Sequence, residues 1–201
     1  MHLANNALIV IDVQNDFCPG GALAVNGGNE IIEGINALML DFPVTILTQD
    51  WHPEDHSSFA SQHKNMAPFQ VTEMIYGPQV LWPTHCVWGT TGAAFHHRLA
   101  TDPADMIIRK GFRHDIDSYS AFFENDHKTP TGLHGYLKER GVTAVTLVGL
   151  ATDYCVNFTA LDAARLGYDV TVLTEYCRAI DLDGSLKQAI KDMKALGVKV
   201  V

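Results

Sequence analysis

The segment Val145-Thr146-Leu147-Val148-Gly149-Leu150-Ala151-Thr152-Asp153-Tyr154-Cys155 predicts a buried strand that passes through a tight turn into a helix. Thr152 and Asp153 are residue types that cap helix N-termini, and an apolar helical face follows at Val156, Ala160, Leu161 and Ala164. A thiol in a first helical turn faces unpaired N–H groups and the positive end of the helix dipole, and both favour the thiolate. Because a thiolate attacks carbonyls, Cys155 is a candidate nucleophile, with a buried core cysteine as the alternative.

Length and composition limit the class of protein. The 201 residues suit one domain, 1–201, and an apolar content of 47% is typical of a folded globular chain. The net charge of −9 disfavours nucleic acid and anionic membrane surfaces as partners. No apolar run approaches the roughly 20 residues that span a bilayer, and the N-terminus lacks the basic region of a signal peptide. Four widely spaced cysteines predict reduced thiols and a cytoplasmic location: Cys18, Cys86, Cys155 and Cys177.

Strand and helix patterns alternate along the chain on both sides of the opening segment. We expect strands at about 7–13, 44–47, 106–108, 144–148, 169–173 and 198–201. Helices are expected at 31–39, where Asn29 can act as the cap, at 131–140, from Cys155 onward, and at 185–196. This alternation predicts a three-layer α/β/α sandwich with a mostly parallel sheet of about six strands. Residues 50–103 are weakly periodic and rich in Pro, His and Gly, which is typical of long functional loops.

Polar residues follow four neighbouring strands of this predicted sheet. Asp12, Asp50 and Lys110 end the first three strands, and Cys155 lies just past the fourth. Ligands of open α/β sheets bind beyond the carboxyl ends of the strands, so we expect these side chains to meet. Burial would raise the pKa of Asp12 and a nearby Lys110 would lower it, which suits a group that takes the thiol proton and later returns it. Taken singly, Asp12 could equally be a turn residue and Lys110 a solvated strand end.

A candidate metal site accompanies these residues. Asp50 and His52 point the same way in an extended chain, and His85 is a candidate third ligand from the long loop. His56 is either a fourth ligand or a residue that supports the others. Two imidazoles and one carboxylate leave coordination positions open, so we expect one divalent ion per chain, with Zn²⁺ preferred to Fe²⁺ or Mn²⁺. Six further histidines are expected to be ordinary surface or core residues: His63, His96, His97, His114, His127 and His134.

Six motifs, in order along essentially the whole chain, resemble the nicotinamidase/pyrazinamidase branch of the isochorismatase-like cysteine hydrolases. They are DVQNDF at 12–17, QDWHP at 49–53, WPTHC at 82–86, KG at 110–111, DSYSAF at 117–122 and GLATDYC at 149–155. The first and last motifs point to the superfamily. The DWHP segment followed by WPTHC points to its metal-containing nicotinamidases.

The resemblance implies a sheet of strand order 3-2-1-4-5-6 and hydrolysis of nicotinamide, and of pyrazinamide, to the acid and ammonia in NAD salvage. It places Asp12, Lys110 and Cys155 at the positions of a catalytic triad, with a thioester intermediate on the cysteine. It places Asp50, His52 and His85 at the metal positions. The amides of Ala151 and Cys155 match the oxyanion hole, beside a cis peptide bond between Leu150 and Ala151. The walls around the pyridine ring match Phe17, Leu23, Trp82 and Tyr119.

Two other classes of function remain open at this point. One is another amide or carbamoyl hydrolase of the same superfamily. The other is a non-catalytic metal-binding or thiol redox protein with the same fold. The sequence also leaves open which metal is bound and whether the chain forms a homo-oligomer.

Overall fold

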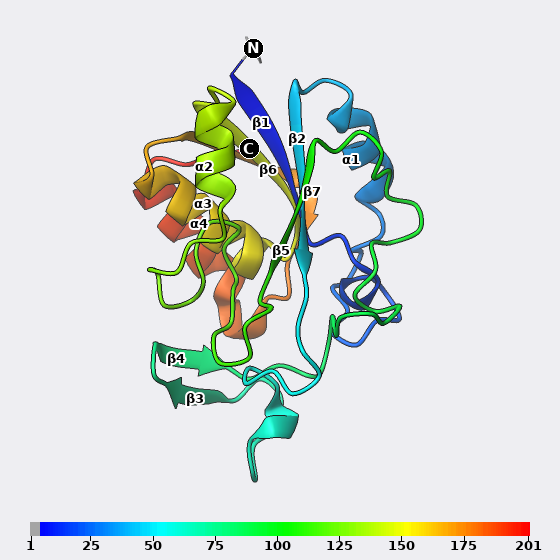
Figure 1. Cartoon of the computed structure of the whole chain (residues 1–201), viewed down its shortest axis with the longest axis vertical. Helices are drawn as coiled ribbons and strands as arrows, with labels where there is room; N and C mark the ends of the chain where they lie inside the picture. Colours follow the sequence, from blue (N-terminus) through cyan, green and yellow to red (C-terminus); the bar gives the residue numbers. More distant parts are fainter. Residues whose placement is uncertain (1–4) are drawn as a thin grey trace.

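The computed structural model describes residues 5–201 and contains a six-stranded sheet (Figure 1). Its strands, in chain order, are β1 (Asn6–Ile11), β2 (Val44–Asp50), β5 (Met106–Lys110), β6 (Ala144–Leu150), β7 (Asp169–Arg178) and β8 (Lys199–Val200). They lie in the order β5-β2-β1-β6-β7-β8, and every neighbouring pair is parallel. This arrangement confirms the predicted 3-2-1-4-5-6 order.

Helices cover both faces of the sheet, as a three-layer sandwich requires. The helix α1 (Ile32–Met39) lies on one side, and α2 (Leu133–Glu139), α3 (Asn157–Arg165) and α4 (Ser185–Ala195) lie on the other (Figure 1). The prediction that Asn29 caps α1 is wrong, because that helix begins after Ile31 without a side-chain cap. Asn29 instead lies in a backbone turn, in which the N–H of Glu30 donates to the Gly27 carbonyl.

The core of the molecule is the sheet itself. All seven residues of β2 and five of the six residues of β1 are buried. Apolar runs of this kind are expected where helices cover both faces of a parallel sheet. Because β1, β2 and β6 are central strands, the residues that follow them are held by the most buried part of the fold.

Residues 51–105 connect β2 to β5, and the first part of this segment lies below the sheet in Figure 1. They contain the antiparallel hairpin of β3 (Val71–Met74) and β4 (Gly77–Val80) and a short 3-10 turn, Ala60–Gln62. Sequence analysis missed the hairpin, because β3 alternates between exposed and half-buried residues and buries no apolar face. None of the helices in residues 5–201 is long and apolar enough to cross a membrane.

Candidate active site

Strands β1 and β5 and the turn after β6 bring Asp12, Lys110 and Cys155 together. The Lys110 ammonium lies 2.8 Å from Asp12 Oδ2 and 3.4 Å from Cys155 Sγ, and it donates to the Ser118 carbonyl at 2.9 Å. Lys110 is only 1% exposed, so it is not a solvated strand end. The cation therefore links the candidate base to the candidate nucleophile inside the protein.

The charges of this cluster depend on burial and on one another. Burial raises the pKa of Asp12, the Lys110 ammonium lowers it, and the net pKa lies above the ordinary value, as expected from the sequence. Burial alone would lower the pKa of Lys110, but Asp12 and Asp50 raise it well above its usual range. Burial also raises the pKa of the Cys155 thiol well above its usual range despite Lys110. This direction favours the thiol form of Cys155, which agrees with the expectation that Asp12 takes the thiol proton.

The turn that carries Cys155 differs from the expected helix start. Residues Thr152–Val156 form a π-helical turn before α3, and neither Thr152 nor Asp153 caps it. The carbonyl of Ala151 accepts the N–H groups of Tyr154 and Val156, at 3.1 Å each, which are the residues on either side of Cys155. Such π-turns are frequent at functional sites. The peptide bond between Leu150 and Ala151 is cis, as the resemblance implied.

Side chains outside the predicted set hold Asp12 and Asp50 in place. The hydroxyl of Thr48 donates to Asp12 Oδ1 at 2.5 Å and accepts the Asp12 N–H at 3.1 Å. This leaves Oδ2 as the Asp12 oxygen that faces Lys110. The amide of the buried Gln14 donates to the Asp50 carbonyl and accepts the Asp50 N–H, both at 2.8 Å. Gln14 belongs to the DVQNDF motif, but its side-chain role was not predictable from the sequence.

Asp50, His52 and His85 form a group that fits a divalent metal. The Nε2 atoms of His52 and His85 lie 3.3 and 3.6 Å from Asp50 Oδ2. Each Nδ1 is within hydrogen-bond distance of a carbonyl: that of His52 is 2.7 Å from the Gly111 oxygen, and that of His85 is 2.8 Å from the Pro83 oxygen. Because a carbonyl only accepts, each Nδ1 carries a proton, and Nε2 is the ring atom of each histidine that can bind a metal. The buried Nε2 of His52 has no hydrogen-bond partner among the described residues, as expected of a metal ligand.

His56 lies beside this group. Its ring centroid is 4.2 Å from that of His52, and its Nδ1 is hydrogen-bonded to Ser58 Oγ at 2.7 Å. Burial lowers its pKa to about 4, so the imidazole is neutral at physiological pH. Two sets of side chains lie close enough to hold a metal ion. One is Asp50, His52 and His85, the other is His52, His56 and Asp117, and His52 belongs to both.

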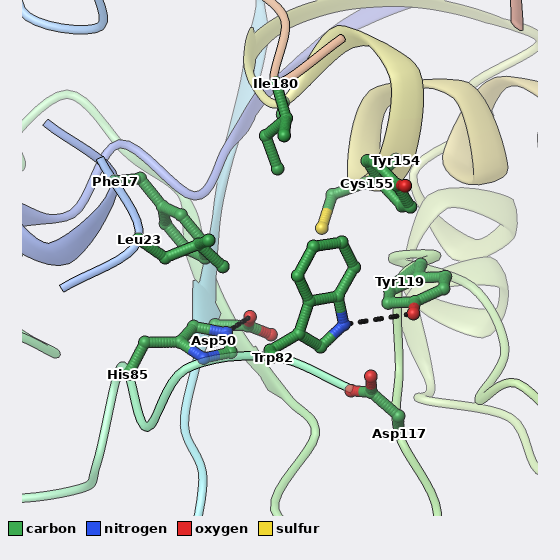
Figure 2. A pocket seen from close by; sticks show the side chains of 11 residues that line it. Phe17, Leu23, Asp50, Trp82, His85, Asp117, Tyr119, Tyr154, Cys155 and Ile180 are labelled. Atoms are coloured by element: carbon green, nitrogen blue, oxygen red, sulfur yellow. Dashed lines mark hydrogen bonds and ion pairs between the residues drawn. The ribbon is translucent and has the colours of Figure 1, made fainter. Parts of the chain in front are cut away.

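A cavity connects the Cys155 thiol to Asp50 and His85 of the candidate metal group (Figure 2). The four predicted ring-binding residues all line it, and Trp82 Nε1 donates to the Tyr119 hydroxyl at 3.1 Å. Sequence analysis missed three further lining residues. Asp117 and Tyr154 adjoin predicted residues in quoted motifs, whereas Ile180 lies in a segment without any motif. The full lining is Phe17, Leu23, Asp50, Trp82, His85, Asp117, Tyr119, Ala151, Tyr154, Cys155 and Ile180.

Known proteins resemble this chain over its whole length. It is 54% identical over 200 residues to the nicotinamidase of Acinetobacter baylyi, covering 99% of this chain and 94% of that protein. The L. infantum protein PnC1, solved in complex with nicotinate, is 39% identical with a TM-score of 0.87, covering 100% of this chain and 94% of that one. The Pyrococcus horikoshii pyrazinamidase, solved in complex with zinc, is 37% identical with a TM-score of 0.78, and covers 98% of both chains. The model of the isochorismatase domain matches residues 6–201, and this chain belongs to the isochorismatase domain family.

Proposed function

We propose that this chain is a cysteine amidohydrolase that converts nicotinamide to nicotinate and ammonia, and pyrazinamide to the corresponding acid, in NAD salvage. The observation that carries the proposal is one cavity with a thiol at one end, a Lys–Asp pair beside that thiol, and a His–His–Asp group at the other end. A flat heteroaromatic amide matches the aromatic walls between them. The names of the relatives, at up to 54% identity, support the same reaction.

The acylation half of the reaction follows from the positions of the buried groups. Asp12 accepts the thiol proton through Oδ2, since Oδ1 already accepts the Thr48 hydroxyl. The sulfur then attacks the amide carbon, and Lys110 balances the negative charge that develops beside it. The N–H groups of Ala151 and Cys155 are proposed to bind the oxyanion, because both residues line the cavity beside the sulfur. Asp12 returns its proton to the nitrogen, ammonia leaves, and a thioester remains.

Deacylation reverses these roles. A water molecule attacks the thioester carbon, Asp12 takes a proton from it, and the Cys155 thiol is restored as the acid leaves. Phe17, Trp82 and Tyr119 keep the ring in the same slot in both halves, so the carbonyl carbon stays next to the sulfur.

Asp50, His52 and His85 are proposed to hold one divalent ion, with Zn²⁺ preferred because the P. horikoshii relative was solved with zinc. When bound, such an ion supplies a Lewis acid that binds a pyridine nitrogen and lowers the pKa of water.

The four cysteines are all free thiols in the structure, which supports a cytoplasmic location.

The test combines metal analysis with ammonia release from nicotinamide, pyrazinamide and benzamide. We expect about one equivalent of metal per chain, turnover of the first two amides, and a kcat/KM for benzamide lower by several orders of magnitude, because benzamide lacks the ring nitrogen. His52→Ala should lose both metal and this discrimination. Equal rates for benzamide and nicotinamide in the metal-loaded protein would contradict the proposed role of the metal group, and absence of any amide turnover would contradict the function.

A further inference from the structure

Ile180 closes the end of the cavity that contains the nucleophile. Figure 2 shows its side chain pointing toward the Cys155 sulfur, with Asp50 and His85 at the opposite end of the cavity. Ile180 follows β7, in a segment that contributes no charged group to the catalytic cluster. It is therefore a purely apolar wall next to the atoms that react.

Asp153 holds this wall in place from the catalytic turn. Its carboxylate accepts the N–H of Ile180 at 3.0 Å, the N–H of Asp181 at 2.7 Å and the hydroxyl of Ser185 at 2.5 Å. Asp153 is only 4% exposed, so water has little access to its carboxylate. The backbone at Asp181 has a φ of 55°, a left-handed conformation that side chains rarely adopt without outside support. Two residues before the nucleophile, Asp153 thus fixes a loop that is 27 residues further along the chain.

We infer that Ile180 restricts the enzyme to primary amides and that Asp153 is the positioning residue that sets this restriction. The inference rests on the proposed function. In the inferred pose, the ring lies toward Asp50 and His85, the carbonyl carbon lies at the sulfur, and the amide nitrogen lies on the side of the cavity that Ile180 lines. A hydrogen on that nitrogen fits there, and an alkyl group meets the isoleucine side chain.

The excluded reaction, hydrolysis of N-methylnicotinamide, differs from hydrolysis of nicotinamide only in its leaving group. With N-methylnicotinamide, the sulfur bonds to the carbonyl carbon, the carbon–nitrogen bond breaks, and Asp12 donates the proton that releases methylamine. Water then hydrolyses the same thioester to nicotinate. The two amides therefore share every step after acylation, and the ratio of their kcat/KM values isolates the space around the amide nitrogen.

The experiment measures kcat/KM for nicotinamide, N-methylnicotinamide and 5-methylnicotinamide in metal-loaded wild type, Ile180→Ala, Ile180→Val and Asp153→Asn. A single extra methyl group changes pocket selectivity by about 10–200-fold, so Ile180→Ala should raise the ratio of N-methylnicotinamide to nicotinamide at least about tenfold. Ile180→Val should raise it less. Asp153→Asn should also raise this ratio, because an amide NH₂ replaces one of the two oxygens that accept hydrogen bonds from the loop. Leu182→Ala, in the same loop but outside the cavity lining, is the matched control and should leave the ratio unchanged.

The outcomes separate the inference from the function on which it rests. Wild-type enzyme that cleaves N-methylnicotinamide as fast as nicotinamide overturns the inference. An unchanged ratio in both Ile180 variants also overturns it, and Ile180→Val covers the case in which the alanine variant does not fold. A gain confined to 5-methylnicotinamide would place Ile180 at the ring instead and contradict the assignment. Wild type without nicotinamide turnover contradicts the proposed function itself.

Discussion

Gly111→Ala should damage the metal group without changing any of its ligands. Gly111 follows β5 with a φ of +66°, and its carbonyl accepts the His52 Nδ1–H at 2.7 Å. A Cβ at this position would lie 2.5 Å from His52 Cε1 and 2.8 Å from Nδ1. Ordinary carbon contacts are about 3.5 Å or longer, so the ring would have to move by about 1 Å. Phe59 and His56 pack against the ring, so that movement misaligns Nε2 with Asp50.

The expected size of the effect has two parts. Loss of an orienting hydrogen bond behind a histidine ligand typically lowers metal affinity about 10–100-fold. An alanine in the left-handed region adds about 1–2 kcal/mol of destabilisation that has nothing to do with metal. Gly141→Ala measures this second part alone, because Gly141 has a φ of +68° and no atom within 4 Å of the position of a Cβ.

The assay is a competition titration with a chromogenic zinc chelator, run with thermal unfolding on wild type and both variants. Both variants should lose stability by a similar amount, and only Gly111→Ala should bind zinc more weakly. If the zinc affinity of Gly111→Ala equals that of Gly141→Ala, the packing of His52 against the Gly111 backbone does not orient the ligand, and the reasoning is refuted.

Three further changes test the catalytic cluster. Cys155→Ala should abolish ammonia release in a folded protein, whereas Cys177→Ala, at a buried thiol that does not line the cavity, should be mild; a loss of only a few-fold for Cys155→Ala would place the nucleophile elsewhere. Asp12→Asn should lower kcat by about 10²–10⁴-fold, because the amide can neither take nor return the proton, and an enzyme with most of its kcat intact would remove Asp12 from the mechanism. Thr48→Val removes a hydrogen bond that lowers the pKa of Asp12, so that pKa should rise and the acidic limb of the kcat/KM profile should move to higher pH; an unmoved or acid-shifted limb would contradict this assignment.

The sheet was predictable because its sequence signals are physical requirements of the fold. Strands buried on both faces must be apolar, and the runs in β1 and β6 are; a polar residue at the end of such a run lies at the edge where ligands bind. The predictions for Asp12, Lys110 and Cys155 used only this rule together with side-chain chemistry. Their convergence in the structure follows from parallel pairing.

The failures occurred where tertiary contacts decide what a side chain does. Asp153 has the side chain of a helix cap and the position of one, yet its carboxylate binds the backbone of a distant loop. Nothing local distinguishes these two uses. Ile180 was missed for the complementary reason, because a lone isoleucine in a loop has no periodicity and becomes part of a cavity wall only through that distant carboxylate.

The Gln14 side-chain amide forms hydrogen bonds with both backbone polar atoms of Asp50, as the peptide groups of a neighbouring strand would. These two bonds hold the backbone of residue 50, whereas its side chain has partners of its own: Oδ1 lies 2.6 Å from the Lys110 ammonium and Oδ2 faces both histidines. A substitution at residue 50 therefore keeps the backbone bonds to Gln14 but removes a carboxylate that pairs with the catalytic lysine. Laboratory libraries that vary residue 50 and hold residue 14 constant should thus yield folded proteins more often than libraries that vary both, and the active members should keep an acidic residue at position 50.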